Sequence, residues 1–109
     1  MAEKLRWICL CRYIPPGSRL DLTRSIDTYH YRGYTVMGLE VTAASRYNAA
    51  LLEVLFNGFI DGSLTLNPRL STQMVRSQQR LVVGQNLGSL VLAPRGEVQV
   101  TRVRLILRR

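Results

Sequence analysis

The segment TYHYRGY, residues 28–34, gathers three tyrosines, the only histidine of the chain and an arginine within seven positions. Aromatic rings can stack on unpaired bases, and a guanidinium group can hold phosphate. Tyr29, Tyr31 and Arg32 are therefore candidate contacts to a single-stranded nucleic acid. The same composition also suits the entry to a β-strand, where tyrosines cover the edge of a core, and Tyr34 fits that structural role better.

Other residues that could do chemistry are few. His30 has Asp27 nearby to orient it, but the chain contains no G-x-S-x-G elbow or comparable setting for a nucleophile. Cys9 and Cys11 lack the C-x-x-C spacing of structural zinc sites and are better explained as buried thiols of a strand. We therefore expect no catalytic residue, no metal and no cofactor, and a small metal-independent ribonuclease is only the third interpretation.

The charge of the chain points to an acidic partner. Fifteen basic residues against seven acidic ones give a formal net charge of +8, and all the basic residues except Lys4 are arginines. Such an excess favours polyanions, although an arginine-rich coding sequence would produce it without any binding. The densest basic cluster lies near the C-terminus. It contains Arg102, Arg104, Arg108 and Arg109. Together with Arg95 it could track a phosphate backbone, or it could merely protect an edge strand from aggregation.

Alternation of apolar residues predicts several strands. Residues 5–14 and 33–42 are predicted as strands, and residues 19–26 form a short strand or irregular structure. Residues 89–93 and 98–107 are predicted as an antiparallel hairpin that turns at Pro-Arg-Gly. The apolar alternation of the last strand changes phase, which predicts a β-bulge near Thr101 and Arg102.

Residues 45–60 are predicted as a helix, with Ser45 as its N-cap and Asp61-Gly62 as its end. Residues 70–83 are predicted as a second helix on a more ambiguous pattern. The first helix would be apolar on nearly all sides, so it would have to be covered by a sheet and by a second element, such as another copy of the chain. The self-association surface predicted on it comprises Leu52, Phe56 and Phe59.

Together these features predict a single α+β domain over residues 1–109, with an antiparallel sheet and two helices packed on it. The function expected first is a small, basic, self-associating module that binds nucleic acid, RNA in preference to duplex DNA. The alternative is a peripheral assembly or adaptor protein, of the viral matrix or accessory type, that binds acidic membranes or host proteins. No apolar run approaches the ~20 residues of a membrane span, so we expect an intracellular protein of the cytoplasm or nucleus.

Overall fold

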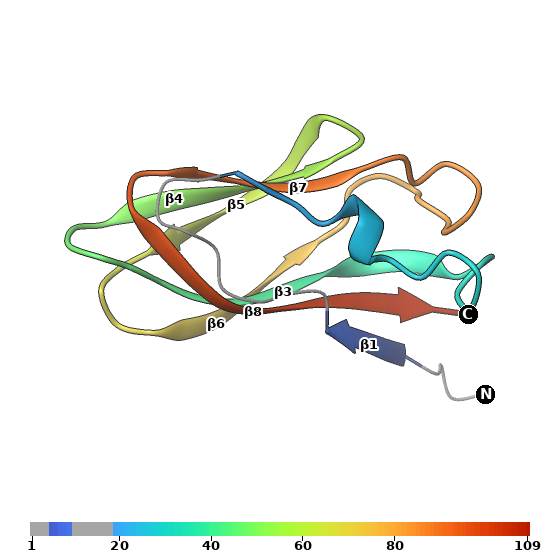
Figure 1. Ribbon diagram of the computed structural model, residues 1–109, viewed down its shortest axis with the longest axis horizontal. Coiled ribbons are helices and arrows are strands. Elements are labelled where there is room, and N and C mark those ends of the chain that lie inside the picture. The colour runs from blue at the N-terminus through green and yellow to red at the C-terminus, as the bar shows by residue number, and fades with distance from the viewer. Residues whose placement is uncertain (1–4, 10–18) are drawn as a thin grey trace.

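The computed structural model describes residues 5–9 and 19–109, and for residues 5–9 only the backbone. The elements in this part of the chain are strands, apart from one short 3₁₀ turn (Figure 1). In chain order they are β1 Leu5–Cys9, β2 Leu20–Asp21, the 3₁₀ turn Thr23–Ser25, β3 Thr35–Ser45, β4 Ala50–Phe56, β5 Phe59–Leu66, β6 Ser71–Arg76, β7 Leu90–Arg95 and β8 Val98–Arg108.

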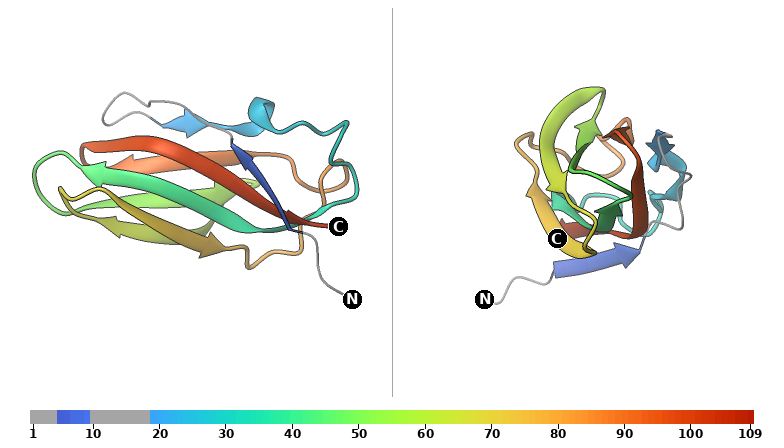
Figure 2. Two further views of the ribbon diagram at one scale, coloured as in Figure 1. Left: turned by 90° about the horizontal axis from the view of Figure 1, so that it is seen from below. Right: turned by 90° about the vertical axis from the view of Figure 1, so that its left-hand side faces the viewer.

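The strands form two four-stranded sheets that pack face to face (Figure 2). The strand order is β1-β8-β3-β6 in one sheet and β2-β7-β4-β5 in the other. Every pair of neighbours is antiparallel. The chain changes sheet at every connection except the one between β4 and β5. This order is that of an eight-stranded jelly roll.

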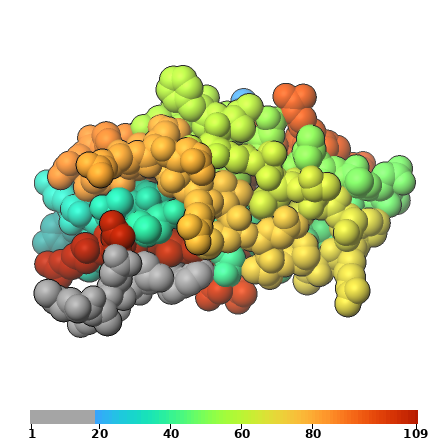
Figure 3. Space-filling view, turned by 180° about the vertical axis from the view of Figure 1, so that it is seen from behind, coloured from blue at the N-terminus to red at the C-terminus, as the bar shows by residue number. Residues whose placement is uncertain are grey.

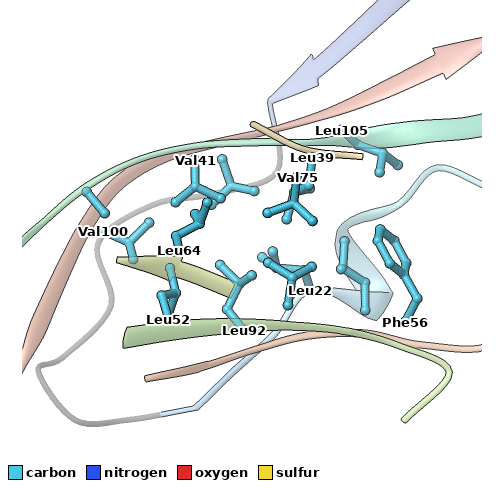
Figure 4. Close-up of a cluster of buried hydrophobic side chains, with 14 of the residues drawn as sticks. Leu22, Leu39, Val41, Leu52, Phe56, Leu64, Val75, Leu92, Val100 and Leu105 are labelled. Atoms are coloured by element: carbon cyan, nitrogen blue, oxygen red, sulfur yellow. The ribbon is translucent and has the colours of Figure 1, made fainter. Parts of the chain in front are cut away.

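The core fills the space between the two sheets and is built from alternate residues of the long strands (Figure 4). On β4, Leu52, Val54 and Phe56 point inward and are almost completely buried. Burying one such side chain contributes about 1.5–3 kcal/mol to the free energy of unfolding. The pattern of inward and outward residues therefore fixes which side chains of each strand remain available at the surface.

The predicted helix over residues 45–60 is wrong, and with it the α+β class. This segment contains β4 and the start of β5, joined by a two-residue turn in which Asn57 and Gly58 both have positive φ, 54° and 81°. Asn-Gly between apolar runs is the strongest short-range hairpin signal, because both residues tolerate the type I′ turn. The strand resembles an apolar helix in sequence because Leu51 and Leu55, on its outer side, are apolar as well.

The second predicted helix, over residues 70–83, is also wrong. Residues 71–76 form β6 at the edge of its sheet, and the chain then runs irregularly until Val82 makes an isolated bridge to Thr35. The apolar alternation of Val75, Leu81 and Val83 indicates extended chain and competed with the helical pattern of this segment. These three side chains are the ones buried in the core.

The predicted hairpin near the C-terminus needs a correction as well. Its two strands exist as β7 and β8, but they belong to different sheets. Gly96, with φ of 110°, lies in the turn that carries the chain from one sheet to the other. The predicted bulge in β8 is confirmed. Thr42 is opposite Arg102 and Ala43 is opposite Val100, so Thr101 is the extra residue.

A network around Asn57 joins the β4–β5 hairpin to the 77–89 segment, and both lie side by side at the surface in Figure 3. The Oδ1 atom of Asn57 accepts hydrogen bonds from the backbone N–H groups of Gly88 and Ser89, at 2.6 and 3.1 Å. Its Nδ2 group donates to the carbonyl oxygen of Asn86 at 2.7 Å.

We expect Asn57→Gly to lower the free energy of unfolding by about 1–3 kcal/mol, because glycine keeps the positive φ and removes the three side-chain hydrogen bonds. Asn57→Asp retains the two hydrogen bonds that the side chain accepts, so its free energy of unfolding should lie between those of wild type and Asn57→Gly. Urea unfolding of the three proteins measures this order of stability. Equal stability of wild type and Asn57→Gly would contradict the role of this network.

Candidate nucleic-acid interface

Among residues 19–109, four arginines lie on the outer surface of the β1-β8-β3-β6 sheet, which we call the basic face. The side chains of Val75, Val103 and Leu107 are buried in the core. Because successive side chains of a strand point to opposite sides, their neighbours point outward. The basic face comprises Arg76, Arg102, Arg104 and Arg108.

The bulge at Thr101 sets the direction of these arginines on β8. It shifts the alternation, so Val100 and Val103 are both buried while Arg102 faces solvent. The spacing of Arg102, Arg104 and Arg108 predicts a common face, and the structure places them on one. Arg76 was not among the predicted contacts, because residues 70–83 were predicted as a helix. Its alternation with Val75 was the signal that could have identified it.

One carboxylate, that of Glu40, lies on the basic face. Its Oε1 atom accepts hydrogen bonds from Nε and Nη2 of Arg104, at 2.8 and 2.5 Å. The Glu40 side chain is only 15% exposed, and that of Arg104 is 32% exposed. Four guanidinium groups against one carboxylate leave a formal charge of +3 on the described side chains of β3, β6 and β8 that form this face.

The tyrosine segment meets the end of the basic face. Register places Arg108 opposite Thr35, directly after Tyr34. The guanidinium carbon of Arg109 lies 5.8 Å from the centre of the Tyr34 ring, and Tyr31 packs edge-on against the same ring at 5.4 Å. The end of the C-terminal strand and the tyrosine segment, which are far apart in the sequence, therefore contact each other through Arg109 and Tyr34.

The tyrosines of this segment differ in their surroundings. Tyr31 and Tyr34 are half-buried and pack against the core, so both contribute to structure. Tyr29 is 87% exposed, and its only described ring contact within residues 19–109 is an edge-on one with His30 at 5.3 Å. Arg32 is also exposed, with its aliphatic stem over Gly84. Of the predicted nucleic-acid contacts in this segment, Tyr29 and Arg32 are the ones exposed to a ligand.

Asp27 holds the tyrosine turn in place. Its Oδ1 atom accepts hydrogen bonds from the backbone N–H groups of Tyr29 and His30, and its Oδ2 atom lies 2.5 Å from Nδ1 of His30. The hydrogen bonds from the His30 backbone and side chain lower the pKa of the Asp27 carboxyl below its usual value. This exposed pair orients the turn, and no described group of three or more His, Cys, Asp or Glu side chains could hold a metal ion.

Not all the predicted contacts join this surface. Arg95 lies on the opposite sheet, where its Nε atom donates to Glu53 at 2.6 Å, and the bond to Glu53 raises the pKa of Arg95. Of the residues predicted for self-association, Leu52 and Phe56 are buried in the core and cannot form a contact surface. Phe59, at the start of β5, is 70% exposed.

Comparison with known proteins does not assign the chain to a family. No family model matches the chain, and no curated protein matches its sequence. Among solved structures it is similar to a family two carbohydrate esterase from Cellvibrio japonicus, with a TM-score of 0.44 and 14% sequence identity. The match covers 99% of this chain and 36% of the esterase chain. A likeness this distant carries no information about function. Residues 5–9 and 19–109 contain no helix that could cross a membrane.

Proposed function

We propose that this protein is a basic binding module for nucleic acid, with single-stranded RNA as the preferred ligand. The observation that supports this most strongly is that β8, which carries three arginines of the basic face, ends beside the tyrosine segment, where Arg109 contacts Tyr34. Phosphates would lie along the arginines of the basic face. Bases would stack on Tyr29, with Arg32 and Arg109 beside them.

The charge balance of the chain supports a polyanionic ligand. Fifteen basic residues against seven acidic ones leave a formal net charge of +8. The described ion pairs with arginine engage Arg46, Arg95 and Arg104. Arg76 and Arg102 are exposed on the basic face beside the paired Arg104. Their charge is available to an external phosphate.

The shape of the basic face favours a single strand over a duplex. The described elements include no α-helix that could enter a major groove. A sheet whose adjoining turn exposes an aromatic ring, here Tyr29, suits unstacked bases instead. From Arg102 to Arg109 the strand extends about 23 Å, at roughly 3.3 Å per residue. That length accommodates several consecutive phosphates.

We expect wild-type protein to bind a single-stranded RNA oligomer with a log-log salt slope of about −2 to −3, for three or four neutralised phosphates at about −0.7 each. Replacing Arg76 and Arg102 together by Gln should reduce the size of this slope by about 1.4. The control replaces the exposed Arg24 and Arg69 by Gln, with the same loss of net charge away from the basic face. Fluorescence anisotropy at several salt concentrations measures the slopes.

Two results would overturn this proposal. Equal losses of affinity in the two double variants would mean that net charge alone attracts RNA and that the basic face is not the site. Tight binding to anionic vesicles without RNA binding would mean that the basic face binds an acidic membrane and not nucleic acid.

The half-buried carboxylate of Glu40 on the basic face provides a gain-of-function test. Glu40→Gln removes the only described acid from this face, so RNA affinity should rise and the salt slope should steepen by up to about 0.7. Glu53→Gln makes the same change in net charge on the other sheet, where Glu53 holds Arg95. It should leave affinity within about twofold of wild type. If Glu53→Gln raised RNA affinity more than Glu40→Gln, RNA would bind the β2-β7-β4-β5 sheet, which would contradict this proposal.

A further inference from the structure

We propose that two copies of this protein pair through the outer surface of the β2-β7-β4-β5 sheet. We call this surface the apolar face. Its exposed and half-exposed apolar residues are Leu51 and Leu55 of β4, Ile60 of β5, and Val91 and Ala93 of β7.

The apolar face is unusual because antiparallel sheets normally turn polar residues to solvent. On β4 the inward residues are apolar, yet Leu51 on its outer side is apolar as well and 40% exposed. Cross-strand pairing places Leu55 beside both Val91 and Ile60, which forms an apolar row across three strands. Ile60 is 58% exposed. A surface of this kind is typical of a contact between proteins.

Charge favours a second copy as the occupant. In a chain of net charge +8, the apolar face carries Asp21, Glu53 and Arg95, for a formal charge of −1 on the described side chains of β2, β4, β5 and β7 that form it. The opposite, basic face carries +3. Two copies therefore meet with least repulsion when their apolar faces pack together, and both basic faces then point outward.

Shape also favours a symmetric pair. At one end of the apolar face lies a hollow of about 270 Å³ lined by Ala49, Ala50, Leu51, Thr65 and Arg95. At the other end of β5, Ile60 projects beside the hairpin turn. The hollow is several times the ~30 Å³ that one water molecule occupies, so it can receive an aliphatic side chain. A two-fold axis through the middle of the face would bring Ile60 of each copy to the hollow of the other, as an isologous interface requires.

Sedimentation velocity of the full chain from about 1 to 100 µM, without nucleic acid, tests this pairing separately from the proposed function. We expect a monomer–dimer equilibrium for wild type. Ile60→Lys, at the projecting end, and Leu51→Lys, at the hollow, should each weaken dimerisation at least tenfold. Met74→Lys is the control, because Met74 is 47% exposed on the basic face and the change in charge is the same.

Thermal unfolding of each variant establishes that it is folded. A wild-type protein that stays monomeric to 100 µM would overturn the proposal. So would equal weakening by Met74→Lys, or assemblies that keep growing with concentration, because a closed two-fold pair stops at the dimer. If the two apolar-face variants both fail to fold, Leu51→Gln and Ile60→Gln must still shift the equilibrium toward monomer, or the proposal fails.

Discussion

The register between β3 and β8 is the constraint on which the rest of the structure depends. These are the two longest strands, and they lie at the centre of their sheet with eleven residues each. Their pairing, with the bulge at Thr101, sends Val103, Leu105 and Leu107 into the core. A slip of one residue would exchange the two faces of β8 and bury arginines between the sheets, at a cost no domain of this size could offset.

The same register produces the surfaces that we connect with function. It turns the arginines of β8 outward and brings the C-terminus to the tyrosine segment, where Arg109 covers the Tyr34 ring. The outer side of the second sheet differs, because it carries exposed and half-exposed apolar side chains and a formal charge of only −1. Asn57 ties its hairpin to the 77–89 segment, so the end of the sandwich that carries the tyrosines is held by side-chain hydrogen bonds as well as by strands.

The sequence allowed the long strands, the bulge and the common face of the β8 arginines to be predicted, because each rests on alternation within one segment. The helix over residues 45–60 failed because β4 is apolar on both sides, which local spacing cannot distinguish from a buried helix. Asn57-Gly58 carried the correct information, but both residues were interpreted as part of the helix. The contact between Tyr34 and Arg109 could not be predicted, because it joins residues that only the β3–β8 register brings together.

The most direct test of the basic face is a nuclear magnetic resonance titration of ¹⁵N-labelled protein with a short single-stranded RNA. We expect the backbone amides of β8, β6 and residues 28–34 to shift together, with those of Arg76, Arg102 and Arg109 among the largest. The amides of β4 and β5 should change little. Shifts concentrated on β4, β5 and β7, or none at saturating RNA, would contradict nucleic-acid binding by this surface.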